Sequence, residues 1–221
     1  MHRISRDTFE HRSTANRVAE HLRRRIADGV LKPGERIIEL EIAAALEVSR
    51  SPIREALLVL SQEGLVTLLP YRGAIVSKLT KARFEQLLRF RLMLEDFSVV
   101  CAVNNAADND IRAFREHIAL IRQAAQTGNF LECVEADLRA HSYLIGLSGN
   151  AFLERTYTDT ISLMRMYIRI AGMYYRHIAE LADEHEQLID ALLARDVERA
   201  RAVMRKHIEH GFEEAHATLE T

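Results

Sequence analysis

The sequence predicts a mainly α-helical protein with two domains, an N-terminal winged helix-turn-helix and a C-terminal antiparallel all-helical bundle. Two observations predict this division. Helical and β-branched segments alternate in the first third of the chain, whereas after Thr80 there is no proline and apolar residues recur every three or four positions. We expect the winged helix-turn-helix at 1–76, a linker at 77–81 and the helical domain at 82–221.

Two helices joined by a turn come first. Apolar residues at helical spacing mark the first helix: Val18, Leu22 and Ile26. The segment PGERI at 33–37 predicts the turn, and a second helix is expected at about 39–47.

The segment SRSPIREALLVLSQEG predicts a third, short amphipathic helix. Ser51 can cap it, Pro52 suits the first helical position and Gly64 suits a left-handed stop. Its apolar stripe consists of Ile53, Ala56, Leu57 and Leu60. Arg50 and Arg54 lie one turn apart near the start, on another face. Side chains at such positions reach base edges when a recognition helix enters the major groove of DNA.

The segment LVTLLPYRGAIV at 65–76 predicts two short strands around a Pro-Tyr-Arg-Gly turn, which completes a winged helix-turn-helix. An arginine pair alone is usually a solvated face, so this context matters. In the second domain we expect six helices, at 81–106, 108–126, 129–147, 150–174, 176–194 and 196–217.

Composition agrees with an ordinary globular protein of 221 residues, 48% of them hydrophobic. The net charge of −2 conceals an asymmetry, because residues 1–80 hold 13 basic and 10 acidic side chains and the remainder hold 17 and 22. The basic excess lies where DNA is expected to bind. Two cysteines within apolar patterns, no N-terminal signal region and no bilayer-length apolar run predict a reduced, cytoplasmic protein.

Four potential metal ligands fall inside the apolar stripes of the bundle: Asp137, His141, His185 and His207. Asp137 and His141 are one turn apart and could chelate from a single helix. Buried polar groups need partners, which a divalent cation would supply, although a buried histidine is more often a satisfied core residue. An imidazole and carboxylate set suits zinc, nickel, manganese, cobalt or iron. Arg91 also lies in a stripe, where it could pair with Glu95 or form a fork for a ligand carboxylate.

From LRRRIADGVLKPGERI through LEVSRSPIREALLVLSQEGLVTLLPYRGAIV, the first domain closely resembles the DNA-binding domain of the GntR family of bacterial transcription regulators. Residues 81–217 resemble the FCD ligand-binding domain of its FadR branch, in the VanR-like, six-helix form. The matching pieces are RLMLE at 91–95, DLRAHSYLIGLSGN at 137–150, EHEQLIDALLARDVERA at 184–200 and MRKH at 204–207.

The resemblance implies roles for residues of the first domain. Arg50 and Arg54 would read guanines, and Arg72 beside Gly73 at the wing tip could enter the minor groove, although a solvated turn residue is nearly as plausible. The phosphate contacts would come from Arg36, Ser49 and Ser51. Family members often carry a base-reading arginine where this chain has Leu40, so that contact should be missing.

The resemblance also implies a metal held by Asp137, His141, His185 and His207, with two positions left for water or for an effector carboxylate. Zinc, nickel and manganese are the expected metals. We therefore expect no enzyme but a homodimeric regulator, a repressor that releases a palindromic operator when a small organic acid docks at the metal. Two alternatives stay open: a metal-dependent enzyme fused to a DNA-binding head, and a regulator whose metal is purely structural.

Overall fold

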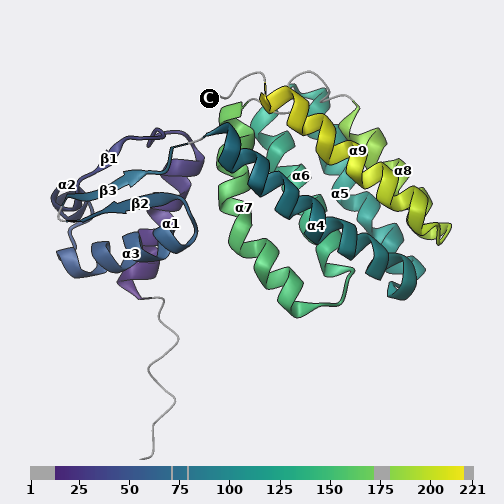
Figure 1. The fold of residues 1–221 in the computed structure, drawn as a ribbon, viewed down its shortest axis with the longest axis horizontal. Helices are drawn as coiled ribbons and strands as arrows, with labels where there is room; N and C mark the ends of the chain where they lie inside the picture. Colours follow the sequence, from purple (N-terminus) through teal and green to yellow (C-terminus); the bar gives the residue numbers. More distant parts are fainter. Residues whose placement is uncertain (1–12, 71, 79, 172–179, 217–221) are drawn as a thin grey trace, which may run out of the picture. The chain divides into compact units, whose positions relative to one another are not determined.

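The computed structural model describes residues 13–70, 72–78, 80–171 and 180–216, and it divides the chain into two compact units, Met1–Lys78 and Leu79–Thr221 (Figure 1). The elements of the first unit are α1 (Thr14–Ala27), β1 (Arg36–Ile37), α2 (Glu39–Ala45), α3 (Arg50–Gln62), β2 (Val66–Leu69) and β3 (Gly73–Val76). Those of the second are α4 (Lys81–Asn105), α5 (Asp108–Gln126), α6 (Phe130–Gly146), α7 (Ala151–Ala171), α8 (Leu181–Leu193) and α9 (Val197–His216).

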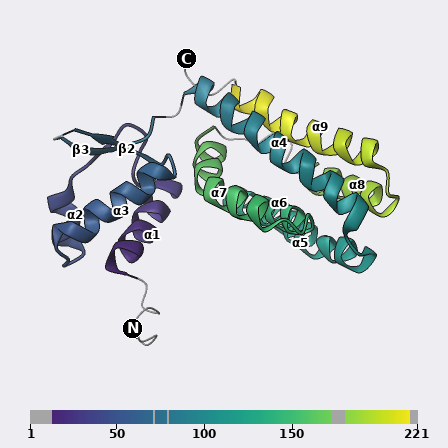
Figure 2. The same ribbon diagram turned by 60° about the horizontal axis from the view of Figure 1, so that its bottom comes forward.

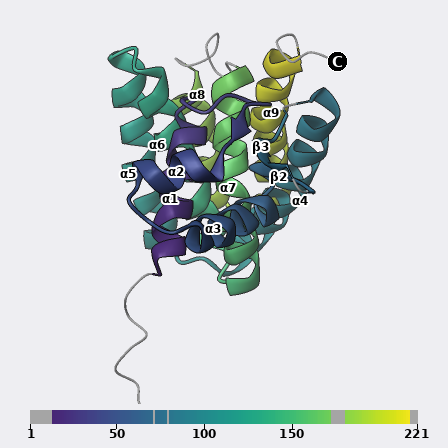
Figure 3. The ribbon, with the colours of Figure 1, turned by 90° about the vertical axis from the view of Figure 1, so that its left-hand side faces the viewer.

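The first unit is a three-helix core with a small antiparallel sheet (Figure 3). Helices α1 and α3 pack together through the apolar stripes predicted for them, and the whole stripe of α3 is at most 2% exposed. The strands β2 and β3 form the expected hairpin, with Val66 paired to Val76. The sequence did not predict β1, which pairs with β3, because two residues are too few to show a period of two.

Helix α3 begins earlier than expected. It starts at Arg50 with Ser49 as its N-cap residue, so the prediction that Ser51 caps the helix was wrong. Pro52 consequently occupies the third helical position. It is tolerated there because none of the first four N–H groups of a helix has an intrahelical acceptor. The predicted stop is confirmed, since Gly64 has a φ of 75°.

Helix α2 ends at Ala45 rather than near Glu47. Leu46 is its C-cap residue, and Glu47 has a positive φ of 53°, which ends the right-handed helix. The connection to α3 is therefore short and tight. This turn fixes how the first residues of α2 lie relative to those of α3.

The second unit is a bundle in two layers (Figure 2). Helices α4 and α9 lie side by side with α8 next to α9, and α5, α6 and α7 form the other layer, in which α6 lies between its two neighbours. The observed bounds agree with the predicted ones to within a few residues, except that the predicted ends at 174, 176 and 217 lie outside the described residues. In the described parts of the chain, the helices are too short or too polar to cross a membrane.

The division between the two units falls between Lys78 and Leu79, inside the linker expected at 77–81. Ser77 is 1% exposed, its N–H donates to the carbonyl of Leu65 and its hydroxyl lies 3.3 Å from that of Thr67. Thr80 already caps α4, because its hydroxyl accepts from the N–H of Arg83. Ser77 thus belongs to the first unit and Thr80 to the second.

Candidate metal centre and nucleic-acid interface

Four arginines line one groove of the first unit, about 650 Å³ in volume: Arg36, Arg50, Arg54 and Arg72. Arg50 and Arg54 come from the first two turns of α3 and have side chains that are 55% and 62% exposed. Among the described residues that line this groove, Glu39 is the one acidic residue. The groove therefore carries a positive excess suited to an anionic polymer.

Glu39 holds the two arginines of α3 in register. Its Oε2 accepts from Arg50 Nη2 at 3.0 Å and from Arg54 Nε at 2.9 Å. Burial raises the pKa of the Glu39 carboxyl, but the two guanidinium groups lower it more, so that the net shift is downward. The carboxylate is thus charged at neutral pH and orients both arginines from the N-terminus of α2.

The other residues predicted to bind DNA take varied positions. Arg36 Nη2 donates to the carbonyl of Arg72 at 2.9 Å and so fastens β1 to the wing turn. Gly73 has a φ of 86°, and an added Cβ would lie 3.4 Å from the carbonyl oxygen of Ile37, which favours glycine there. The hydroxyl of Ser51 bonds to Glu55 on its own helix.

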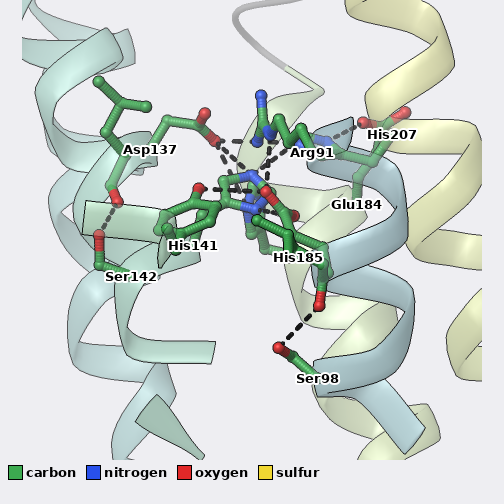
Figure 4. Close-up of polar contacts among 12 residues, drawn as sticks. Arg91, Ser98, Asp137, His141, Ser142, Glu184, His185 and His207 are labelled. Carbon is green, nitrogen blue, oxygen red and sulfur yellow. Dashed lines mark hydrogen bonds and ion pairs between the residues drawn. The ribbon is translucent and has the colours of Figure 1, made fainter. Parts of the chain in front are cut away.

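In the second unit, helices α6, α8 and α9 bring together the four predicted ligands: Asp137, His141, His185 and His207 (Figure 4). One ligand atom from each lies within 4.8 Å of the others, and all four residues are at most 3% exposed. The i,i+4 spacing on α6 and the packing of α8 against α9 create this arrangement.

Each imidazole is oriented through its Nδ1 atom. The acceptors are Glu95 Oε2 at 2.6 Å for His141, the Leu181 carbonyl at 2.7 Å for His185, and Glu184 Oε2 at 2.9 Å for His207. A carbonyl oxygen can only accept, so His185 Nδ1 carries the proton and its Nε2 presents a lone pair. Such bonds fix tautomer and ring orientation in metal sites.

The Nε2 atoms converge on the Asp137 carboxylate. The distances to Asp137 Oδ1 are 3.4 Å from His141, 3.4 Å from His185 and 3.8 Å from His207. Neither oxygen of Asp137 nor His185 Nε2 forms a hydrogen bond with any residue that the structure describes. A buried carboxylate left in this state is costly, and a cation between these atoms removes the cost. The residues therefore fit a divalent metal.

The protonation states of His185 and Asp137 suit the same role. Burial and the neighbouring His207 lower the pKa of His185 to about 3, so its imidazole is neutral at physiological pH. Burial raises the pKa of the Asp137 carboxyl, but the three histidines lower it by more than burial raises it. The net shift is downward, which leaves the group ionised. Neutral imidazole and ionised carboxylate are the forms that bind metals.

Comparison with known proteins agrees with this division of roles. Residues 14–76 match the gntR family of bacterial regulatory proteins, and residues 86–210 match the FCD domain. The chain belongs to the GntR family and carries an FCD domain. FCD domains commonly bind a metal, which agrees with the buried group in α6, α8 and α9.

Relatives of this GntR-family regulator match along most of their length. The Nta operon transcriptional regulator of Aminobacter aminovorans is 30% identical, over 83% of this chain and 85% of the relative. The gluconate operon transcriptional repressor of Bacillus subtilis is 26% identical, over 94% and 86%. A crystal structure of a GntR regulator from Rhodococcus sp. RHA1 has a TM-score of 0.80 at 25% identity, over 95% of this chain and 100% of that one. McbR/YncC of E. coli shares the fold, with a TM-score of 0.79 at 22% identity, over 94% and 99%.

The GntR-family chain also contains site residues that sequence reasoning missed. Glu184 binds both His207 and His210, each at 2.9 Å. Tyr157 donates to Glu95 at 3.1 Å and helps hold the carboxylate that orients His141. No sequence spacing marks these partners, because they come from different helices.

Arg91 is 1% exposed, as predicted, and its Nε donates to Glu95 Oε1 at 2.6 Å. The ion pair expected one turn apart is therefore present. Burial raises the pKa of the Glu95 carboxyl, but Arg91 and His141 lower it to about 2. Glu95 thus links Arg91 to His141 and so to the histidine cluster.

Proposed function

We propose that this chain is a repressor whose affinity for a palindromic DNA operator is lowered by a small organic acid bound at a divalent metal centre. The observation that carries the metal-binding part is the set of three imidazoles whose Nδ1 atoms are hydrogen-bonded and whose Nε2 atoms face Asp137, a carboxylate without a hydrogen-bond partner among the described residues. The relative that represses a gluconate operon supports the repressor role.

In the DNA-binding half, Arg50 and Arg54 read guanines through their guanidinium forks. Arg36, Ser49 and Ser51 bind phosphates, and Arg72 beside Gly73 carries the wing into the minor groove. One recognition helix contacts too few base pairs to specify a unique DNA sequence, so a homodimer binds two half-sites. The protein acts in the cytoplasm.

In the second half, Asp137, His141, His185 and His207 hold zinc, nickel or manganese. When bound, the metal supplies Lewis-acid positions for the oxygen atoms of a carboxylate. Arg91 adds a cationic fork beside the same cluster, through its link to Glu95.

The effector acts on DNA through a change in the bundle that re-spaces the two DNA-binding domains, with the linker expected at 77–81 as the hinge. An effector can lower DNA affinity only by the amount by which it prefers the non-binding arrangement. Typical coupling corresponds to a change of about 5- to 150-fold in the operator dissociation constant. This range is what a titration with the correct acid should give.

Thermal melting of chelated and metal-loaded protein with a panel of small organic acids tests the proposal. A correct acid at about 100 times its dissociation constant stabilises by about 2.7 kcal/mol, which raises the melting temperature by roughly 5 °C or more. We expect this rise in the metal-loaded protein alone. Equal stabilisation of both forms would place the effector elsewhere and leave the metal a structural role.

Glu184→Gln tests how the histidines are oriented. The amide keeps the shape and can still accept from His207, but it lacks the charge that increases ligand basicity, so metal affinity should fall about 10-fold or more. Metal competition titrations measure this change. Glu186→Gln on the same helix is the control, because Glu186 pairs with Arg115 and Arg122 and should leave affinity unchanged. Equal affinities for both variants would contradict the orienting role.

A metal-dependent enzyme is the second candidate, favoured by open positions on a histidine-bound metal that could activate water. The relatives are transcriptional regulators, and Glu95, the buried acid beside the cluster, is engaged by Arg91, His141 and Tyr157. Incubation of metal-loaded protein with each stabilising acid, followed by product analysis, separates the two. Turnover of the acid would favour the enzyme.

A further inference from the structure

Leu40 is an exposed apolar side chain in the arginine-lined groove. It is the second residue of α2, is 66% exposed, and lines the groove with Arg50 and Arg54. Ala43 is the buried residue of α2, so Leu40 contributes little to the core. Single exposed leucines are common on protein surfaces, but this one lies within a positively charged groove suited to a nucleic acid.

Leu40 directly follows the residue that holds Arg50 and Arg54 together. The preceding residue, Glu39, binds both Arg50 and Arg54 through one carboxylate oxygen. A ligand that engages the two guanidinium groups therefore also meets the first turn of α2. Leu40 and the two arginines line the same groove.

The chemistry of leucine limits what it can recognise there. Its side chain has no hydrogen-bond donor or acceptor, so it cannot bond to the polar edges of guanine, adenine or cytosine. In the major groove, the one apolar group that the four standard bases display is the C5-methyl of thymine. On the basis of the proposed operator binding, we propose that Leu40 is a specificity-determining residue that selects a thymine in each half-site.

The expected size of this selection is modest and measurable. Removing one methyl group from an apolar contact costs about fourfold in affinity, on the scale of a buried methylene. With two half-sites, loss of both methyl groups should weaken binding roughly 15-fold. Deoxyuridine differs from thymidine by that methyl group alone, so its substitution isolates the contact.

The experiment begins with selection of an operator from random duplexes by the full-length protein. Each thymine is then replaced by deoxyuridine, and dissociation constants are measured for the wild type and for Leu40→Ala. We expect one symmetry-related pair of thymines at which the wild type loses about 15-fold. Leu40→Ala should bind the thymine and uracil operators equally, at the weaker level.

Two further variants assign the contact. Leu68 also lines the groove but lies on β2 and is 41% exposed, so Leu68→Ala should keep the sensitivity to the methyl group. Leu58 is a 52% exposed leucine of α3 that does not line the groove, and Leu58→Ala should behave as the wild type. Because all three side chains are exposed, the variants are expected to fold.

The outcomes separate this inference from the proposed function. A selected operator at which no thymine is sensitive to methyl removal, or at which Leu40→Ala keeps the sensitivity, overturns the role of Leu40 and leaves operator binding intact. Loss of the sensitivity to methyl removal in Leu68→Ala, with the sensitivity kept in Leu40→Ala, overturns it as well. Failure of the wild type to select any sequence would overturn operator binding, and the Leu40 contact with it.

Discussion

Arg54→Ala is expected to abolish selective operator binding while the metal content stays unchanged. A bidentate contact between arginine and guanine discriminates by about 1–3 kcal/mol, or roughly 5- to 150-fold for each half-site. The Arg54 side chain is 62% exposed and its ion pair is with Glu39, which keeps Arg50 as a partner. The fold should therefore survive, and the lost affinity should reflect base recognition.

Fluorescence anisotropy with the selected operator and with a scrambled duplex measures the change, and elemental analysis measures the metal. Arg54→Lys should keep most of the salt-dependent binding to both duplexes but lose the preference between them, because lysine lacks the planar fork. Arg24→Ala is the matched control, since Arg24 is 74% exposed on α1 and does not line the groove. A wild-type preference in Arg54→Ala would refute the assignment.

His185→Ala is expected to remove the metal and the effector response together. Its Nε2 is 3.4 Å from Asp137 and has no hydrogen-bond partner among the described residues. Loss of a residue that merely orients a ligand costs about 10- to 100-fold in metal affinity, so loss of a direct ligand should cost more than about 100-fold. Competition titration measures the affinity, and operator release by the acid measures the response.

The comparison that separates a metal effect from a folding effect is the melting temperature with and without metal. The wild type should be stabilised by metal, whereas His185→Ala should melt at the same temperature in both conditions. His117→Ala is the control, because His117 lies in the same unit, packs against the Tyr143 ring and is not part of the ligand cluster. If His185→Ala still released the operator in response to the acid, docking at the metal would be wrong.

Much of the fold follows from local patterns in the chain. The apolar stripe of α3 and the stop at Gly64 predicted that helix, and the β-branched segments around the wing turn predicted β2 and β3. The bounds of α5 agree with the prediction at both ends, at Asp108 and Gln126. These features depend on residues close together in sequence, so periodicity and turn chemistry are sufficient to find them.

The start of α3 shows where local reasoning fails. A serine before a proline predicted a cap at Ser51, yet the tight turn after α2 begins the helix at Arg50. The same turn brings Glu39 to both arginines. Bridges between residues 11 and 15 positions apart have no sequence period, so the chain alone could not indicate that one carboxylate holds both Arg50 and Arg54.

The sequence by itself determined the residue types of the candidate centre and the helices that bear them, because a polar residue inside an apolar stripe must point inward. Only the tertiary structure decided that the three Nε2 atoms meet at Asp137. It also decided that Glu95, the Leu181 carbonyl and Glu184 hold the opposite sides of the rings. The direction of each ring depends on the packing of α4, α6, α8 and α9 against one another, and such long-range contacts leave no trace in local spacing.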